Sequence, residues 1–417
     1  MQEHKFSCNG LYLRAAATFE SFIVKTALFA WELGRGLGHV MNIRRVAARL
    51  KAHGVKVIAA VSDPAAAGHL GDVADDVVTA PAWPFATRPD VSRGASSATL
   101  NDILASAGLA DAAAVQRLLL AWDDLFAQVR PDLLVAEFSP LAAVAARGRI
   151  PVVWMGNGFT VPPHEMRRFP LLHRVMEPMW KEEATLDAVN TALSATKRQP
   201  LECLPQLFAG DAHLIYAFPV LDPYDTQRVG PVDGPLLDRL PEPRRDDAQS
   251  VFAYLSSGYQ PHPSVFDALR PLAAALRIHA PKLSSGQLAE LRALGAQVDA
   301  IAPPLHDVLP QARLVVHNGG SGVASEALLA GVPQVVLSAQ IEQDLNGAAL
   351  QRAGVARLVR THEPGLSLSP ELLRDAMADP ALLREAADMA VYCRDFAKAA
   401  DAPARSEDVC LRLLQVR

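Results

Sequence analysis

The sequence has few cysteines, and they are widely spaced. Its 417 residues include four, none of them in a CxxC pair. This pattern gives no sign of a zinc site or a disulfide framework and favours a reducing cytoplasm. The four are Cys8, Cys203, Cys393 and Cys410. An excess of positive charge is also missing, because 40 basic residues stand against 45 acidic ones for a net charge of -5. A nucleic-acid role is therefore not expected.

Long hydrophobic runs are absent too. No stretch reaches the roughly 20 apolar residues that a membrane helix needs. The first two dozen residues lack the apolar core and small-residue cleavage site of a signal peptide. We interpret residues 1–24 as a poorly ordered extension, and a start codon assigned too early, with the true start near Ile23, is an open alternative. The length favours two domains.

Apolar and amphipathic segments alternate through the first half of the chain. An apolar run at 25–33 is followed by the glycine-rich "GRGLGH", an amphipathic segment at 40–54 and a second apolar run at 55–61. Strand, turn, helix and strand at this spacing are typical of a βαβ unit, whose two strands are parallel. Further strands are expected at 131–138 and 151–157, and helices at 114–129 and 140–149.

A segment rich in Pro, Asp and Arg interrupts the alternation and predicts an interdomain linker at 219–249. Strands are then expected at 251–257, 275–280, 296–301, 313–318, 333–339 and 355–359. The predicted fold class is α/β, with two doubly wound Rossmann-like domains at 25–218 and 250–380. They are expected to face each other across a cleft, where open α/β sheets bind ligands. Residues 381–417 are predicted to be helices that pack back on the first domain.

One stretch, "HNGGSGVASEALLAGVPQVVLSAQIEQ" from His317 to Gln343, carries the clearest functional signal. Glycines between a strand and a helix let the backbone approach a ligand, and the free N–H groups of the first helical turn bind phosphate. Glu326 is placed to accept hydrogen bonds from a ribose, and Glu342 and Gln343, after the next strand, to bind sugar hydroxyls. A glycine turn alone would be weak evidence, but these four elements in order favour a nucleotide-sugar site.

This stretch resembles the donor-binding signature of the UDP-glycosyltransferase superfamily, whose members have the two-domain GT-B fold. It is most similar to the bacterial members that act on natural products and glycolipids. The resemblance implies that the turn binds the donor diphosphate, that Glu326 holds the ribose, and that Glu342 and Gln343 grip the sugar with support from Asn346. The residues implied at the diphosphate are Asn318, Gly319, Gly320, Ser321, Gly322 and Val323.

Three residues depart from the family pattern. Asn318 stands where the family has its phosphate-binding His, while His317 falls one residue earlier, on the strand end. An amide donates a hydrogen bond to phosphate but carries no charge. Val323 replaces a small hydroxyl residue, and Glu342 replaces Asp. More of the diphosphate site is therefore left to the backbone.

The glycine-rich "GRGLGH" matches the family's Gly-His at Gly38 and His39, which makes His39 the candidate general base. Glu137, in "PDLLVAEFS", occupies the position of the family's Asp, whose carboxylate orients the imidazole. Asp132 is expected to be a cap or turn residue. For His39 the plainer interpretation is a polar residue in a first helical turn.

The resemblance, with a single candidate base, implies an inverting hexosyltransferase that needs no metal and no cofactor. It would move a sugar from a UDP- or dTDP-linked donor to a hydroxyl of a small-molecule or lipid acceptor. One alternative is a catalytically silent nucleotide-sugar-binding relative, which Asn318 and Val323 favour. Another is a nicotinamide-dependent oxidoreductase that uses "GRGLGH" with Asp63.

Two segments are candidates for acceptor contacts. Residues 156–181 contain Arg167, Arg168, Phe169, Met176, Met179 and Trp180. They either line the acceptor pocket, touch a membrane peripherally, or form an ordinary packed loop and helix. Residues 88–102 have the composition of a loop that covers the acceptor.

Overall fold

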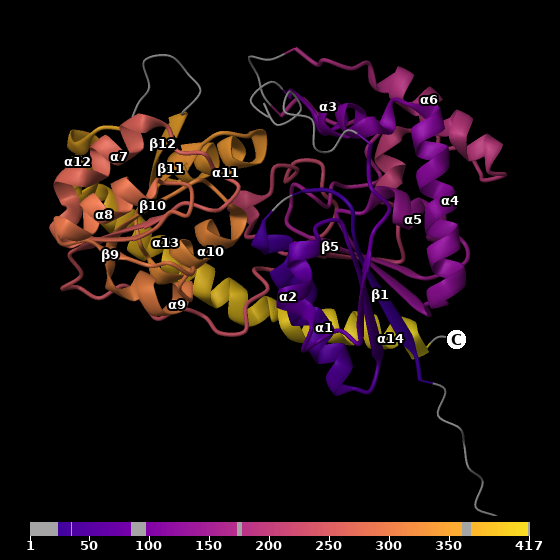
Figure 1. Cartoon of the computed structure of the whole chain (residues 1–417), viewed down its shortest axis with the longest axis horizontal. Coiled ribbons are helices and arrows are strands. Elements are labelled where there is room, and N and C mark those ends of the chain that lie inside the picture. The colour runs from indigo at the N-terminus through magenta and orange to yellow at the C-terminus, as the bar shows by residue number, and fades with distance from the viewer. Residues whose placement is uncertain (1–23, 35, 85–96, 173–176, 361–367, 416–417) are drawn as a thin grey trace, which may run out of the picture.

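The computed structural model describes residues 24–34, 36–84, 97–172, 177–360 and 368–415, which form two α/β domains side by side (Figure 1). Each contains a six-stranded sheet, ordered β3-β2-β1-β4-β5-β6 in the N-terminal domain and β12-β11-β10-β7-β8-β9 in the C-terminal domain. All the paired strands are parallel. Counted from the first strand of each domain, both orders are 3-2-1-4-5-6, that of the Rossmann fold. The predicted fold class is therefore confirmed.

The strands and helices have the following bounds. The strands are β1 Thr26–Trp31, β2 Lys56–Val61, β3 Asp76–Thr79, β4 Leu133–Glu137, β5 Val152–Gly156, β6 Ala212–Ile215, β7 Ser250–Tyr254, β8 Leu276–His279, β9 Gln297–Val298, β10 Ala312–His317, β11 Gln334–Ser338 and β12 Ala356–Arg360. The helices are α1 Leu37–Ala52, α2 Ala67–Leu70, α3 Leu100–Leu104, α4 Ala112–Val129, α5 Pro140–Ala146, α6 Glu182–Ala195, α7 Pro263–Leu269, α8 Ser285–Ala293, α9 Leu305–Val308, α10 Ser321–Ala330, α11 Ile341–Arg352, α12 Pro370–Ala378, α13 Pro380–Ala400 and α14 Ala402–Gln415.

The continuous apolar runs of the central strands arise because helices cover both faces of each sheet. In β1, Leu28 and Ala30 join one buried cluster, while Ala27, Phe29 and Trp31 join another on the opposite face. Successive strand residues point to opposite faces, so a strand covered on both sides is apolar along most of its length. The polar residues of such strands, such as Glu137 and His317, stand at the strand ends.

Two strands, β3 and β6, are absent from the expectations based on sequence. Both lie at edges of the N-terminal sheet and contain four residues each. β3 has no fully buried residue, and its sequence DVVT shows neither an apolar run nor a clear alternation. Short edge strands expose one side, so burial leaves little trace in their sequence.

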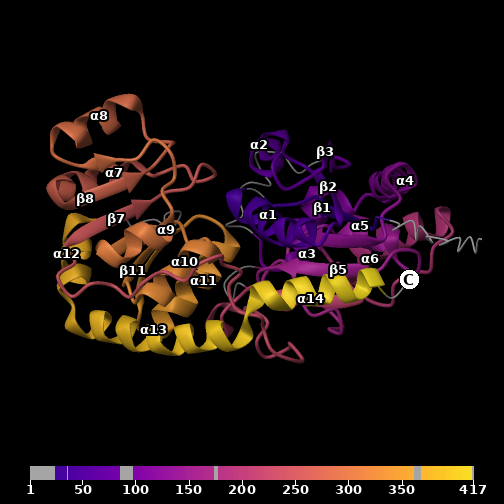
Figure 2. The ribbon, with the colours of Figure 1, turned by 90° about the horizontal axis from the view of Figure 1, so that it is seen from below.

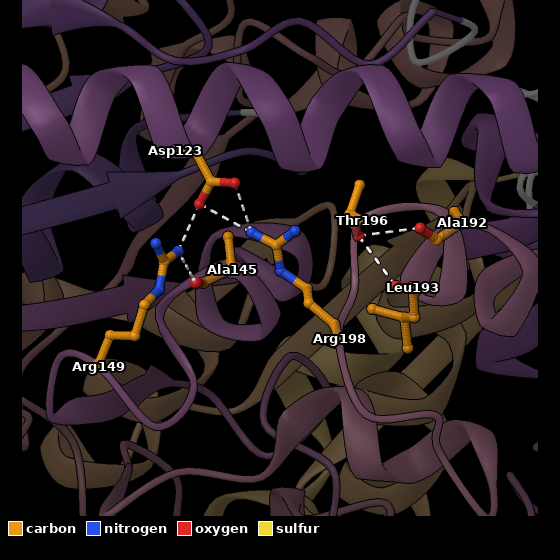
Figure 3. Close-up of polar contacts among 7 residues, drawn as sticks. All are labelled: Asp123, Ala145, Arg149, Ala192, Leu193, Thr196 and Arg198. Carbon is orange, nitrogen blue, oxygen red and sulfur yellow. Dashed lines mark hydrogen bonds and ion pairs between the residues drawn. The ribbon is translucent and has the colours of Figure 1, made fainter.

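A polar cluster on the outer side of the N-terminal domain joins three of its helices (Figure 3). Asp123 of α4 accepts hydrogen bonds from Arg149, which follows α5, and from Arg198, which follows α6. Burial alone would raise the pKa of Asp123, but the two guanidinium groups outweigh it and lower that pKa below its usual range. This cluster lies among α4, α5 and α6 and has a structural role.

The chain crosses between the domains twice. It first does so between β6 and β7, where Pro219–Leu221 form one 3₁₀ turn and the buried pair Asp222 and Arg228 anchors the linker to the N-terminal domain through Gly158 and Val161. It returns through α13, which packs on α10, and α14, which packs on α1, β4 and β6. Figure 2 shows α13 under the C-terminal domain and α14 under the N-terminal one.

The apolar side of α14 is part of the N-terminal core. Val409, Cys410 and Leu414 belong to the same buried cluster as β1 and α1. The Tyr216 hydroxyl pairs with Ser406 Oγ at 2.8 Å, and Glu407 binds Arg49 and His53. The last helix thus completes a domain whose first strand lies about 370 residues earlier in the sequence.

In the part of the chain that the structure describes, no single helix is long and apolar enough to cross a membrane. Leu100–Leu109 and Ala112–Val129 pass that test jointly, as a pair bent by 79°.

Val409→Asp should detach α14 from the N-terminal domain, because it places a carboxylate in an apolar contact. We expect a loss of about 3 kcal/mol in the free energy of unfolding of that domain. All five tryptophans lie in the N-terminal half, so their fluorescence during urea unfolding reports on this domain. The matched control is Asp408→Asn on the exposed side of the same helix. Equal midpoints for the two variants would show that the packing of α14 contributes nothing.

Candidate functional site

The predicted site residues gather where the carboxyl ends of the two sheets approach each other. His39 follows β1 and Glu137 ends β4, while the glycine turn follows β10 and Glu342 follows β11. Direct hydrogen bonds join the two groups, since Asn157 of the N-terminal domain donates to both Ser321 and Glu342. The candidate site is therefore built from both domains.

His39 and Glu137 form a hydrogen-bonded pair. His39 lies in the first turn of α1, and its Nδ1 is 2.7 Å from Glu137 Oε1. The imidazole stacks between the rings of Trp31 and Phe138, with centroid distances of 5.5 and 6.5 Å. A proton on Nδ1 donated to the carboxylate leaves the lone pair on Nε2. This is the arrangement that a general base requires.

Gly34 lets the chain pass close to the reactive nitrogen of His39. It has φ +86°, and a Cβ built on it would lie 2.3 Å from His39 Nε2. Any larger residue would displace the imidazole. Gly38, by contrast, has open space around the position of a Cβ. The first glycine of "GRGLGH" thus leaves the space that the imidazole of His39 occupies.

Burial and charge act in opposite directions on this pair. Burial lowers the pKa of His39, but the hydrogen bond and the charge of Glu137 outweigh it, so the pKa of His39 is raised above its usual value. Glu342 of the other domain adds to this rise. Burial also raises the pKa of Glu137, and His39 offsets part of that rise. The imidazolium is therefore stabilised where it would form.

Glu137→Gln should lower the pKa of His39, because the charge of Glu342 alone would then oppose desolvation. The pKa can be followed by ¹H–¹⁵N correlation spectra of the imidazole across a pH series. Asp132→Asn, at the other end of β4, serves as the control. An unchanged His39 pKa in Glu137→Gln would show that the two side chains are not coupled.

His317 supports the glycine turn from within the core. It is fully buried, its Nε2 is 2.9 Å from Gln334 Oε1, and its Nδ1 accepts from the Gly319 N–H. Burial lowers the pKa of His317 to about 4, so the ring is neutral with its proton on Nε2. Asn318, one residue on, accepts from the Ser256 N–H through Oδ1. The contact of Asn318 with the donor phosphate stays a prediction, for which its Nδ2 is the available donor.

The glycines of the turn fall into two kinds. Gly319 has φ +81°, and a Cβ there would lie about 3 Å from the backbone of Gln343. Gly320 and Gly322 have nothing within 4 Å of a Cβ position. Gly320 is the N-cap of α10 and provides no side-chain cap, so the first N–H groups of this helix remain for a ligand. Gly319 shapes the turn, while Gly320 and Gly322 border free space.

Gly319→Ala and Gly322→Ala should therefore differ in stability. The first forces a Cβ into the α11 backbone at a positive φ, and we expect it to cost about 1–3 kcal/mol. The second removes a glycine from a helix at an open position, and it should leave stability unchanged or raise it by up to about 1 kcal/mol. Urea unfolding followed by far-UV circular dichroism measures both. Equal losses would contradict the distinction.

Glu326 lies on α10 and is buried, with 9% of its surface exposed. Burial raises its pKa to about 7, and the positive charge of Arg45 offsets part of this rise. Arg45 belongs to α1 of the opposite domain and also binds Asp238 of the linker through Nε at 3.2 Å. A carboxyl so poorly solvated gains from hydrogen-bond donors such as ribose hydroxyls.

The polar residues after β11 contact three different parts of the structure. Glu342 Oε1 accepts from Asn157 across the cleft, whereas Gln343 Oε1 accepts from the Ala339 N–H at 2.9 Å. Asn346 donates to the Gly319 carbonyl at 2.9 Å and so braces the turn. The predicted sugar contact of Gln343 stays a prediction that rests on its amide nitrogen. Asn346, expected to support the sugar contact, instead donates to the glycine turn.

Other residues named from the sequence have structural partners. Asp132 accepts from the Thr26 N–H and binds Lys25, as expected of a cap or turn residue. Asp63 caps the 3₁₀ turn after β2 by accepting from the Ala65 N–H, so it is engaged in a local contact. The oxidoreductase alternative needs Asp63 for a ribose, and this local contact weakens it.

The two candidate acceptor segments are described in part. Residues 88–96 and Met176 lie outside the described residues. Asp102, the last residue of the 88–102 segment, accepts from the Met179 and Trp180 N–H groups, which ties the two segments together. Phe169 is buried, whereas Met179 and Trp180 are 52% and 41% exposed. The acceptor role of these segments stays a prediction.

Sequence reasoning missed Asn157 and Arg45. Asn157 follows the apolar run of β5 directly, and a polar residue in that position of a parallel strand is a usable signal. Arg45 gives no such signal, because it is one of several basic residues along α1. Within the described residues, no group of three or more His, Cys, Asp or Glu side chains is arranged to hold a metal ion.

Comparison with known proteins gives one family model and several glycosyltransferases that resemble this chain. Residues 267–405 match the family model of the erythromycin biosynthesis protein CIII-like C-terminal domain. The chain is 37% identical over 102 residues to the elloramycin glycosyltransferase ElmGT of Streptomyces olivaceus, covering 24% of this chain and 25% of that protein. It is 27% identical over 270 residues to the PGL/p-HBAD biosynthesis rhamnosyltransferase of Mycobacterium bovis, covering 56% and 57%.

A third relative is the TDP-daunosamine transferase DnrS of Streptomyces peucetius, 27% identical over 288 residues, with 63% of this chain and 64% of that protein covered. The matches thus span between a quarter and just under two thirds of these three relatives. They make the chain similar in sequence to bacterial glycosyltransferases of natural products and glycolipids.

Solved structures agree on the fold. The calicheamicin glycosyltransferase CalG4 superposes with a TM-score of 0.68 at 19% identity, covering 94% of this chain and 98% of that one. The glycotransferase of kitacinnamycin gives a TM-score of 0.67 at 19% identity, covering 94% and 99%. At this identity the likeness shows the fold alone, and that fold is GT-B.

Proposed function

We propose that this chain is a glycosyltransferase that moves a sugar from a UDP- or dTDP-linked donor to a hydroxyl group of a small-molecule or lipid acceptor. The observation that carries the proposal is the juxtaposition of two half-sites. The His39 and Glu137 pair of one domain lies within electrostatic reach of Glu342 of the other. Glu342 shares Asn157 with Ser321, at the N-terminus of α10.

The chemistry follows from these positions. His39 Nε2 takes the proton of the acceptor hydroxyl as its oxygen forms the new bond to the anomeric carbon. Glu137 accepts the Nδ1 hydrogen bond and stabilises the imidazolium. The bond from the anomeric carbon to the diphosphate breaks, and its electron pair leaves with the diphosphate. A single base opposite the leaving group gives inversion at the anomeric carbon.

The leaving group is stabilised by the backbone in this proposal. The N–H groups at 320–323 and the positive end of the α10 dipole face the diphosphate. Asn318 contributes an amide where the family has a chargeable imidazole. Donors fixed in position before the reaction stabilise developing charge effectively, so the proposal includes no metal ion.

The printed names of the relatives guide the donor class. One transfers rhamnose, and another is a TDP-daunosamine transferase. These activities belong to those proteins, and they make dTDP-deoxysugars reasonable donors to assay beside UDP-glucose. The main alternative is a silent nucleotide-sugar-binding relative, favoured by the loss of charge at Asn318.

Glu326→Ala and His39→Ala should separate binding from turnover. The purified chain is titrated by calorimetry with UDP-glucose, dTDP-glucose and dTDP-rhamnose, and products are followed by mass spectrometry. Loss of ribose contacts in Glu326→Ala should weaken donor binding about tenfold or more. His39→Ala should keep donor binding and lower turnover at least about a hundredfold.

Gly38→Ala, next to the base and without a clash, is the matched control and should retain activity. Donor binding without turnover in the parent protein, on every acceptor tested, would favour the silent relative. Donor binding unaffected by Glu326→Ala would overturn the assignment of the ribose site.

A further inference from the structure

The side chain of Asn157 makes two hydrogen bonds between the domains, although no sequence motif includes it. Asn157 Nδ2 is 2.7 Å from Glu342 Oε1 and 3.0 Å from Ser321 Oγ. Both acceptors belong to the C-terminal domain, and they stand in the first turns of α11 and α10. One amide therefore links the two helix ends that border the proposed donor site.

The direction of this amide is fixed by its own loop. Asn157 Oδ1 accepts from the Thr160 N–H at 2.9 Å, so Nδ2 must face the other domain. The loop begins at Gly156, where a Cβ would lie 2.4 Å from Thr160 Oγ1 and 3.1 Å from Glu137 Oε2. Gly156, the residue before Asn157, thus packs beside the carboxylate of the proposed catalytic pair.

The acceptor Glu342 needs such a partner. Burial raises its pKa, His39 and the Asn157 hydrogen bond lower it, and Glu137 raises it further. Without Asn157, Glu342 would face Glu137 with one hydrogen-bond donor fewer. The neighbouring Ile341 is buried in the N-terminal core, so the α11 turn is already docked there and Asn157 decides how its carboxylate is oriented.

We infer that Asn157 is a positioning residue for the donor sugar. It occupies Glu342 Oε1 and leaves Oε2 to accept a hydrogen bond from a sugar hydroxyl beside His39. The sugar subsite is then assembled from both domains, whereas the nucleoside diphosphate is bound by the C-terminal domain. This inference rests on the proposed function, and it names which part of the donor each domain recognises.

The test compares the affinity for UDP-glucose and dTDP-glucose with that for UDP and dTDP, by calorimetry on the full chain. Asn157→Ala should weaken binding of the nucleotide sugar about tenfold and leave binding of the nucleoside diphosphate within about twofold. The control is Asn190→Ala, which removes a similar two-way side-chain contact to Leu201 inside the N-terminal domain. It should change neither affinity.

A second test exchanges the amide of Asn157 and the carboxylate of Glu342, and measures whether nucleotide-sugar binding recovers. A residue with only a structural role would not produce that recovery. Asn157→Asp places two carboxylates face to face and should weaken nucleotide-sugar binding more than Asn157→Ala. Adding Glu342→Gln to it restores the net charge, lets the new amide donate to the new carboxylate, and leaves an amide oxygen for the sugar. The double variant should recover most of the affinity lost in Asn157→Asp.

The outcomes separate the two proposals. If the parent protein binds the nucleotide sugars and Asn157→Ala binds them equally well, the inference is wrong and the proposed function stands. It is also wrong if the double variant binds no better than Asn157→Asp. If the parent protein binds neither the sugars nor the diphosphates, the proposed function fails and the inference falls with it.

Discussion

Parallel strands covered on both faces leave little room for polar chemistry except at and beyond their carboxyl ends, and this constraint determines where the site lies. β1 and β4 are buried along their whole length, so His39 stands just past one strand and Glu137 closes the other. The same holds for the turn after β10 and for Glu342 after β11. Because both sheets have the same strand order and their carboxyl ends meet, the four positions form one site.

The electrostatics of the site divide it into two regions. Burial raises the pKa of three carboxyl groups, Glu137, Glu326 and Glu342, and the nearby cationic groups are His39 and Arg45. Such a lining favours neutral ligands rich in hydroxyl groups over anions. The start of α10 instead offers the backbone N–H groups at 320–323 and the positive end of a helix, while the Gly319 N–H is taken by His317. A nucleotide sugar carries a sugar rich in hydroxyl groups and an anionic diphosphate. It therefore matches both regions of the proposed site.

Much of the fold was predictable from the sequence, because most strands appear as apolar runs between helical segments. The edge strands β3 and β6 were not predicted, since each has only four residues and too few of them are buried to give such a run. The site was predictable where one motif carries it, as in the turn after His317. The position of Asn157 after β5 is a signal that was not used, whereas Arg45 gives none. The partners of both residues in the other domain depend on distances that a single sequence does not contain.

The most direct measurement of the central claim is calorimetric titration of the purified chain with UDP and dTDP against UMP and dTMP. The account places the second phosphate on the N-terminus of α10, so the diphosphates should bind at least about tenfold more tightly than the monophosphates. That preference should be lost when a side chain fills the open position at Gly322. Equal affinity for mono- and diphosphates, or a preference that survives Gly322→Leu, would contradict the account.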